Sequence, residues 1–237
     1  MKLINIIFIS LLFIQGINAK ENLNETLYID DGALKLESTL PPPPSSDSMQ
    51  VQIELDTIKR IMAKLTNDQK ELARKDALTQ NVSFFSDTLT GFDIEKLPKT
   101  KFLFDSVKYN ASYFSNMFKN NFMKKRPYQE DQEIKVCVSP QPSSLNRTYP
   151  SGHTTMGYAM GLILAELIPE KSKEIMLRTR LYGENRVNCG AHYPSDVAAG
   201  QVLGTLVAFE LLKNNEFKAL LLASKDELLK SGLTYAN

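Results

Sequence analysis

The sequence predicts an all-α protein, a compact single-domain helical bundle with central apolar helices. Apolar residues recur at intervals of three and four through most of the chain after residue 50, the spacing of one helix face. The alternating pattern of a strand is almost absent and is confined to "IKVCV", residues 134–138. Residues 157–169 and 197–212 are apolar on most sides but short for a membrane span, which is typical of central helices in a core.

Residues 1–19, "MKLINIIFISLLFIQGINA", have the pattern of a secretory signal peptide. One lysine precedes an apolar run from Leu3 to Ile14, and the small residue Ala19 marks the expected cleavage site. A membrane anchor is the alternative, although the apolar run is shorter than the ~20 residues that a span needs. We therefore expect a protein that is exported to the periplasm or secreted further.

The composition bounds the partners of the exported chain. Of the 237 residues, 43% are hydrophobic and 23% charged, which is typical of a globular protein and suits one domain. The formal net charge of +1 falls to zero once Lys2 leaves with the signal peptide. This neutral balance does not favour nucleic acid or an anionic membrane as a partner, and we expect no stable membrane insertion.

The exported chain divides into an arm and a helical domain. Residues 20–50 are polar and contain "LPPPP", which excludes helix and favours an extended polyproline II segment. We predict that this Pro-rich arm lies over the domain; a disordered linker is the alternative. The domain covers residues 51–237, and its predicted helices run over 51–65, 68–79, 97–122, 151–167, 169–182, 195–212 and 215–230, with a short one starting at 83.

The chain contains two cysteines, Cys137 and Cys189. Export places them in an oxidising compartment, where a disulfide is expected, and a bridge over so long a loop stabilises a fold by roughly 4 kcal/mol in the chain-entropy model. Two buried free thiols are the alternative. No CxxC or Cys/His cluster is present in the sequence, so we expect no metal and no other cofactor.

One of the chain's two histidines lies in "YPSGHTTMGYAMG", residues 149–161. Pro150 ends the preceding segment, and Ser151 is a good N-cap for the apolar helix that follows. The first turn of a helix binds anions through its free N–H groups, and Gly152 leaves that turn uncovered. His153 would stand beside such an anion. A capped helix with an incidental surface histidine is the alternative.

The other histidine lies in "NRVNCGAHYPSD", residues 185–196. Arg186 precedes His192 by six positions, and Asp196 follows it by four. A carboxylate this close accepts a hydrogen bond from one ring nitrogen, which leaves the other nitrogen free as a nucleophile or base. The alternative is a surface histidine beside a capping aspartate.

A basic run, "KNNFMKKRPYQ", supplies positive charge at residues 119–129. Lys119 and Arg126 are seven positions apart and share a helix face if the helix persists. Arginine grips phosphate with two donors, whereas lysine supplies a point charge. We interpret Lys124 and Lys125 as a solvated helix face.

These three stretches together resemble the phosphatidic acid phosphatase type 2 superfamily. Its signature, K-x6-R-P, then P-S-G-H, then S-R-x5-H-x3-D, matches Lys119 to Pro127, Pro150 to His153 and Arg186 to Asp196 with every spacing kept. The signal peptide and the "LPPPP" arm make the chain most similar to the class A bacterial nonspecific acid phosphatases. The resemblance covers roughly residues 39 to 215. One position departs from it, because Asn185 occupies the place of the motif serine.

The resemblance implies the phosphatidic acid phosphatase type 2 / vanadium haloperoxidase-like fold and a secreted acid phosphatase of broad range, with phosphotransfer as a side activity. It implies that small-molecule phosphomonoesters are hydrolysed through a phosphohistidine, without a metal or cofactor. His192 would be the nucleophile, Asp196 its orienting group and His153 the general acid. The phosphoryl oxygens would be held by Lys119, Arg126, Ser151, the Gly152 amide and Arg186.

Three other functions fit parts of the pattern. A membrane lipid phosphatase shares the three blocks but needs several apolar spans of ~20 residues. A vanadium haloperoxidase holds vanadate with similar residues, and a periplasmic phosphate-binding protein would use the cationic groups without turnover. A binding protein needs donors but no pair of histidines, which favours an enzyme. The sequence leaves the preferred phosphomonoester and the choice between monomer and homo-oligomer open.

Overall fold

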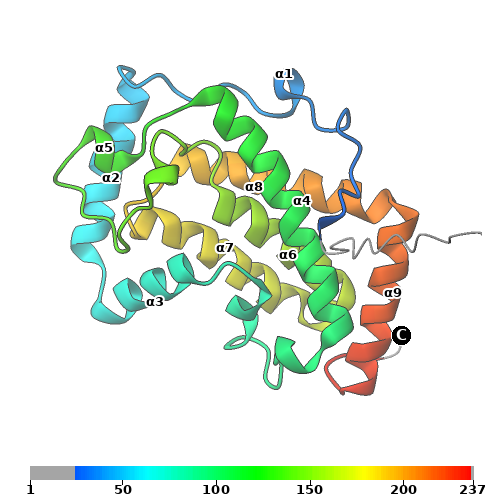
Figure 1. Ribbon diagram of the computed structural model, residues 1–237. Coiled ribbons are helices and arrows are strands. Elements are labelled where there is room, and N and C mark those ends of the chain that lie inside the picture. The colour runs from blue at the N-terminus through cyan, green and yellow to red at the C-terminus, as the bar shows by residue number, and fades with distance from the viewer. Residues whose placement is uncertain (1–24, 236–237) are drawn as a thin grey trace, which may run out of the picture.

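The computed structural model describes residues 25–235 and confirms the all-α class (Figure 1). The expected signal peptide, residues 1–19, lies outside the described residues. Residues 25–235 contain no strand. The α-helices are α1 (Leu36–Thr39), α2 (Met49–Lys64), α3 (Asn67–Leu78), α4 (Pro98–Phe122), α5 (Pro127–Glu130), α6 (Gly152–Leu167), α7 (Ser172–Asn188), α8 (Pro194–Lys213) and α9 (Asn215–Lys230). Short 3-10 turns lie at Val82–Phe85, Ile94–Lys96, Pro142–Ser144 and Pro169–Lys171.

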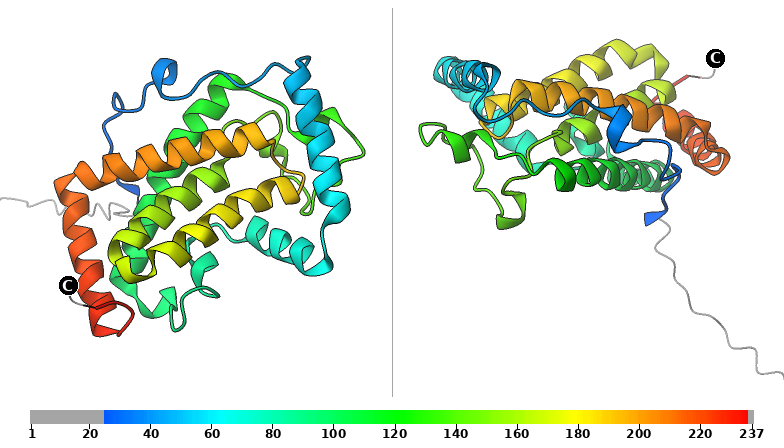
Figure 2. Two further views of the ribbon diagram at one scale, coloured as in Figure 1. Left: turned by 180° about the vertical axis from the view of Figure 1, so that it is seen from behind. Right: turned by 90° about the horizontal axis from the view of Figure 1, so that it is seen from above.

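Helix α6 lies at the centre of the bundle and packs against α4, α7 and α8 (Figure 2). Glycines let the backbones approach closely. A Cβ on Gly204 of α8 would lie 2.3 Å from the carbonyl oxygen of Thr155, and one on Gly161 of α6 would overlap the side chain of Thr179 in α7. Since no side chain fits at either contact, glycine at these positions lets α8 and α7 both pack closely against α6.

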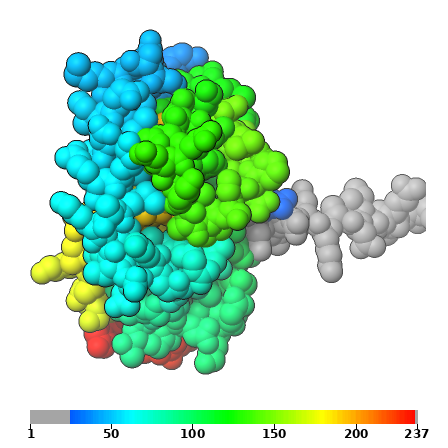
Figure 3. All heavy atoms as spheres, turned by 90° about the vertical axis from the view of Figure 1, so that its left-hand side faces the viewer, coloured from blue at the N-terminus to red at the C-terminus, as the bar shows by residue number. Residues whose placement is uncertain are grey.

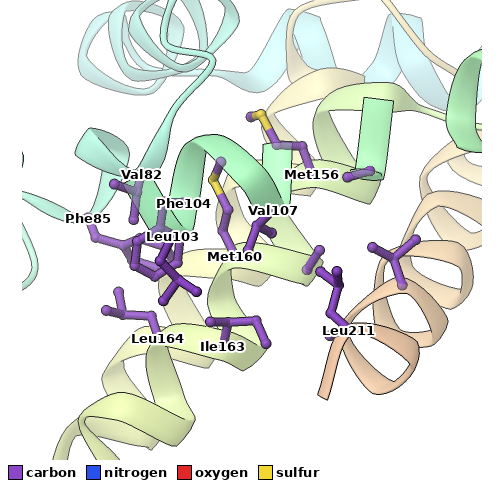
Figure 4. Close-up of a cluster of buried hydrophobic side chains, with 14 of the residues drawn as sticks. Val82, Phe85, Leu103, Phe104, Val107, Met156, Met160, Ile163, Leu164 and Leu211 are labelled. Carbon is purple, nitrogen blue, oxygen red and sulfur yellow. The ribbon is translucent and has the colours of Figure 1, made fainter. Parts of the chain in front are cut away.

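The hydrophobic core lies where α4, α6 and α8 meet (Figure 4). The apolar positions expected from the three-and-four spacing supply it: Leu103, Phe104 and Val107 from α4, Met160, Ile163 and Leu164 from α6, and Leu203, Val207 and Leu211 from α8 are all buried. Dense packing of this kind fixes helix positions and therefore the side chains at the helix ends.

By length and composition alone, α8 is the one helix within residues 25–235 that could cross a membrane. Half of its apolar stretch is buried inside the structure, where α8 packs against α4, α6, α7 and α9. A central core helix has the same length and composition, and the contacts of α8 are those of a core helix.

The Pro-rich arm lies against the helices in its described part (Figure 2). Leu34 and Leu40 are buried, and the hydroxyl of Tyr149 donates a 2.8 Å hydrogen bond to the Pro41 carbonyl. Nearer the N-terminus, the amide of Tyr28 donates to Oδ1 of Asn110 in α4. The arm also contains the short helix α1, which the sequence does not predict.

Two segments differ from the sequence-based expectation. Helix α7 continues six residues beyond Tyr182, the expected end, and stops where Gly190 adopts φ 68°. Left-handed glycines commonly end helices, and Gly183 is accommodated inside the helix because it faces Thr154. The strand-like segment 134–138 is irregular and has no strand partner within the described residues. Its backbone hydrogen bonds are a local one, from the Ile134 amide to the Asp131 carbonyl at 3.2 Å, and one to the turn after α7, from the Cys137 amide to the Cys189 carbonyl at 3.0 Å.

Candidate active site

The predicted site residues come together in two adjoining hollows. A cavity of about 210 Å³ is lined by residues that include Lys119, Arg126, Gly152, His153 and His192. A neighbouring hollow of about 260 Å³ shares Arg126 and His153 and adds Arg186. Ser151 and Asp196 lie beside them, fully buried. The structure thus places all eight predicted catalytic and phosphate-binding residues in one region.

The basic run reaches the cavity through a turn rather than along one helix face. Helix α4 ends at Phe122, and Met123 adopts the left-handed conformation with φ 49°. Lys119 therefore lies in the last helical turn, whereas Arg126 lies in extended backbone just before Pro127. The helix does not continue to Arg126, so Lys119 and Arg126 do not share a helix face as the sequence suggests.

Lys119 is a buried cation and Arg126 a half-buried one, and the described partners of both are mostly carbonyl groups. Arg126 donates to the carbonyls of Ser144 and Ala191, both at 2.9 Å, and Lys119 Nζ donates to that of Arg147 at 2.8 Å. Burial, and then the charge of Arg126, holds the pKa of Lys119 well below its usual range. An anion between these two groups would offset their desolvation.

Arg186 provides donors without an acceptor. Its Nε and Nη1 atoms are buried and have no hydrogen-bond partner among the described residues, although the side chain lines the second hollow. Burial lowers its pKa to about 10, so the guanidinium remains charged at neutral and acidic pH. Buried donors are almost always paired, and an anion held in the hollow would supply the missing acceptor.

The first turn of α6 borders the same cavity. Ser151 is the N-cap, and its hydroxyl oxygen accepts hydrogen bonds from the backbone and the hydroxyl of Thr154. A Cβ on Gly152 would lie 3.4 Å from Cε of Lys119, so glycine leaves the space between the helix start and the lysine open. The Ser151 amide donates to the Asp196 carbonyl at 3.0 Å, which ties the starts of α6 and α8 together.

The contacts of His192 define its tautomer. Nη1 of Arg126 lies 3.2 Å from Nε2 of the ring. A guanidinium only donates, so we assign Nε2 as the acceptor and Nδ1 as the protonated nitrogen. Nδ1 faces Thr148 Oγ1 at 3.0 Å and Asp196 Oδ2 at 3.3 Å. Burial, and then the charge of Arg126, lowers the pKa of His192, which keeps the ring neutral with its lone pair on Nε2.

His153 faces the cavity from the first turn of α6. Its Nε2 lies 3.1 Å from the carbonyl oxygen of Ala77 at the end of α3. Because a carbonyl only accepts, Nε2 carries the proton and Nδ1 is the nitrogen that titrates. Burial, followed by the charge of Arg186, holds the pKa of His153 well below its usual range.

Two side chains of the site are missed or misread from the sequence. Lys124 is not part of a solvated face: it is buried, and its Nζ lies 3.4 Å from Oδ1 of Asp196 and 4.0 Å from the ring centre of Tyr193. It lies past the end of α4, where helical periodicity no longer reports burial. Lys125 is exposed, as expected. Thr148 contacts both His192 and Asp196 and carries no signal in the sequence beyond its position near Pro150.

The expected disulfide between Cys137 and Cys189 is present. Cys189 follows the end of α7, three residues after Arg186 and three before His192, so the bridge attaches the turn between α7 and α8 to the segment after α5. On this side of the molecule, α3 and the loop between α5 and α6 lie next to each other (Figure 3) and both line the second hollow.

These observations define a class, an all-α protein with a cavity lined by cationic side chains and flanked by two histidines. The chain belongs to the PAP2 superfamily. The sequence profile of that superfamily matches residues 106–218. The resemblance drawn from the three motifs is therefore confirmed at the level of the family.

Curated relatives match most of the chain. It is 31% identical over 198 residues to the "Acid phosphatase" of Zymomonas mobilis subsp. mobilis, a match that covers 81% of this chain and 75% of the relative. It is 29% identical to the "Non-specific acid phosphatase" of Providencia stuartii, over 81% of this chain and 79% of the relative. A protein of the same name from Salmonella typhimurium is 28% identical, over 80% of this chain and 78% of the relative.

Proposed function

We propose that this protein is an acid phosphatase that hydrolyses small phosphomonoesters through a phosphohistidine at His192, without a metal. The observation that carries the proposal is the position of Nε2 of His192, which we assign as unprotonated, beside Arg126 and near the buried cation Arg186, with His153 on the same cavity. The names of the relatives, acid phosphatase and non-specific acid phosphatase, support the same activity.

The cations would bind the phosphoryl group first. Two buried donor atoms of Arg186, Nε and Nη1, have no partner among the described residues. Arg126, Lys119 and Gly152 line the adjoining cavity. In phosphoryl transfer, negative charge spreads over the three equatorial oxygens, so fixed donors that surround them stabilise the transition state. Three cationic side chains supply the charge that Mg²⁺ supplies in other phosphotransferases.

The chemistry would then proceed in two displacements. Nε2 of His192 attacks phosphorus while the bond to the leaving oxygen breaks, and His153 gives that oxygen a proton. The positive charge that develops on His192 is stabilised by Asp196 through Nδ1. In the second displacement, water attacks the phosphohistidine, His153 takes a proton from it, and inorganic phosphate and free His192 are released. An alcohol in place of this water would yield phosphotransfer.

The charge state of His153 favours acidic conditions. In the empty site its pKa lies below the usual value of 6.5, so it is neutral at neutral pH. A bound phosphomonoester brings negative charge next to the ring and raises that pKa again, which lets His153 act as an acid. Lower pH increases the protonated fraction in the free protein.

We also propose export to the periplasm, on the pattern of residues 1–19, and a broad substrate range. The cavity walls beyond the cations carry small polar side chains, Ser112, Ser115 and Asn116, which suit varied leaving groups. Within residues 25–235 only α8 has the length and composition of a span, which argues against a multi-span lipid phosphatase.

The test is phosphate release from p-nitrophenyl phosphate by the purified protein, with His192→Ala as the control. We expect turnover at acidic pH and an acid-labile phosphohistidine, trapped by rapid quench, in the wild type only. Halide oxidation with vanadate and peroxide, in the absence of phosphatase turnover, would instead identify a haloperoxidase. Tight phosphate binding without turnover would identify a binding protein.

A further inference from the structure

The carboxylate of Asp196 is surrounded by donors from three parts of the chain. Its Oδ2 lies 2.5 Å from Thr148 Oγ1, 2.9 Å from the Tyr193 amide nitrogen and 3.3 Å from His192 Nδ1. Its Oδ1 lies 3.4 Å from Lys124 Nζ. Asp196 and Thr148 have no exposed surface, so bulk water does not reach these contacts.

The distances single out Thr148 as the nearer neighbour of the nucleophile. Nδ1 of His192 lies 3.0 Å from Thr148 Oγ1, inside the usual range of a hydrogen bond, and 3.3 Å from the Asp196 carboxylate, beyond it. The three atoms form a triangle, so the hydroxyl bridges the carboxylate and the ring alongside the direct contact. The direct contact from His192 to Asp196 is the weaker of the two.

The chemistry of the groups fixes the direction of both hydrogen bonds. An ionised carboxylate only accepts, so the single hydroxyl proton of Thr148 goes to Asp196. The lone pairs of Oγ1 are then left to accept from Nδ1–H of His192. This direction agrees with the acceptor role that Arg126 imposes on Nε2. The hydroxyl is thus polarised by the carboxylate and made a better acceptor for the ring proton.

The backbone holds Thr148 at two points. Its amide donates to the Lys124 carbonyl at 3.2 Å, and its carbonyl accepts from Lys119 Nζ at 3.3 Å. The side chain of Lys124 contacts Oδ1, the other oxygen of Asp196. Lys119 and Lys124 thereby position both Thr148 and the carboxylate to which the Thr148 hydroxyl donates.

We propose that Thr148 is a positioning residue of the reaction. Its hydroxyl, polarised by Asp196, accepts from Nδ1 of His192 next to the direct contact between the ring and the carboxylate, and so relays part of that charge and helps to hold the ring in the Nδ1–H tautomer. This inference rests on the proposed function, in which Nε2 of His192 is the nucleophile. It adds a residue outside the three sequence motifs and extends the His192–Asp196 pair to a group of three side chains that contact one another.

The tautomer can be measured directly because the chain has two histidines. Full-length protein labelled with 15N-histidine gives two sets of ring signals, and His153→Gln assigns them. Protonated and unprotonated ring nitrogens differ widely in chemical shift. We expect Nδ1 of His192 to be protonated in the wild type, and we expect Thr148→Val, which removes only the hydroxyl, to populate the Nε2–H form.

Kinetics supply the second readout. Outer partners on the ring N–H of metal-binding histidines commonly contribute about 10- to 100-fold. We expect an effect of the same size here, so Thr148→Val should lower the rate of phosphohistidine formation and kcat by about that factor, with KM little changed. Thr148→Ser keeps the hydroxyl and should restore most of the rate. Thr179→Val is the matched control, because Thr179 is buried in α7 and donates to its own helix, at the Ile175 carbonyl.

The outcomes separate the inference from the proposed function. Thr148→Val with the wild-type tautomer and the wild-type rate would overturn the relay. Equal losses in Thr148→Ser and Thr148→Val would also overturn it, since they would mean that packing and not the hydroxyl matters. If the wild type forms no phosphohistidine, the proposed function fails, whereas the 15N signals still report whether Thr148 sets the tautomer.

Discussion

The side-chain amide of Asn185 donates a 2.7 Å hydrogen bond to Oδ2 of Asp76. Asp76 is buried at the end of α3 and is also bound by the guanidinium of Arg178, at 3.0 Å and 2.5 Å. The next residue, Ala77, provides the carbonyl that accepts from His153. Asn185, which stands in place of the motif serine, thus attaches α7 to α3. Through α3 it helps to position the Ala77 carbonyl that contacts His153, the expected general acid.

Replacing Asn185 should weaken this attachment. Asn185→Ala leaves one oxygen of a buried carboxylate with fewer donors, and a lost hydrogen bond to a charged group amounts to about 1.5–3 kcal/mol of the free energy of unfolding. Urea unfolding would measure the loss. Asn188→Ala is the control, because Asn188 donates to Asn185 and not to Asp76. Equal stability of the two variants would contradict a role for the Asn185–Asp76 contact.

The disulfide should contribute strongly to stability. It joins residues 52 positions apart, and the chain-entropy model gives about 4 kcal/mol for a loop of that length. Cys137→Ala/Cys189→Ala should therefore lower the unfolding temperature, and the variant should lose activity as the loop of His192 loosens. Thiol labelling of the denatured, unreduced exported protein should find no free cysteine. Two labelled thiols would show that the bridge does not form.

Much of the fold follows from the sequence because it depends on local periodicity. Leu103 and Val107 in α4, four positions apart, and Met160, Ile163 and Leu164 in α6, three and four positions apart, mark helix faces that do enter the core. The motif spacings likewise select the residues that line the cavity. Lys124 and Thr148 escape prediction because each is placed by a long-range contact, to Asp196, that no local pattern encodes.

The role of Asn185 escapes prediction for a related reason. Motif spacing marks the position, but the hydrogen bond to Asp76 spans 109 positions in sequence and depends on how α3 docks on α7. The end of α7 is similarly underestimated, because Gly183 looks like a helix breaker until the side chain of Thr154 is seen to face it.

Activity should be independent of divalent metals. Buried cationic side chains border the cavity, and we expect them to neutralise the phosphoryl oxygens without an ion. Activity of the purified protein should survive EDTA and be inhibited by vanadate, which mimics pentacoordinate phosphorus. Loss of activity in chelator, restored by a divalent metal, would contradict this mechanism.

The pH dependence should report His153. Burial and the charge of Arg186 place its pKa in the free protein below 6.5, so the active, protonated fraction falls as pH rises through that lowered value. The falling limb of kcat/KM should therefore lie below pH 6.5, after the ionisation of the substrate is divided out. Bound phosphate raises the pKa, so the limb of kcat should lie at higher pH. The limb should vanish in His153→Ala; a limb that persists there belongs to another group.

The two histidines should fail in different ways, which tests their roles directly. His192→Ala removes the nucleophile, so no phosphohistidine can form from any substrate. His153→Ala leaves attack possible but strands the leaving oxygen without a proton. General acid catalysis typically contributes about 10²–10⁴-fold, and that loss should apply to an alkyl phosphate but shrink for a nitrophenyl phosphate, whose leaving group is stable without a proton. The measurement is kcat/KM of both variants on both substrates, with rapid-quench trapping. Phosphorylated His192→Ala, or a His153→Ala defect of equal size on the two substrates, would show that the roles are assigned wrongly.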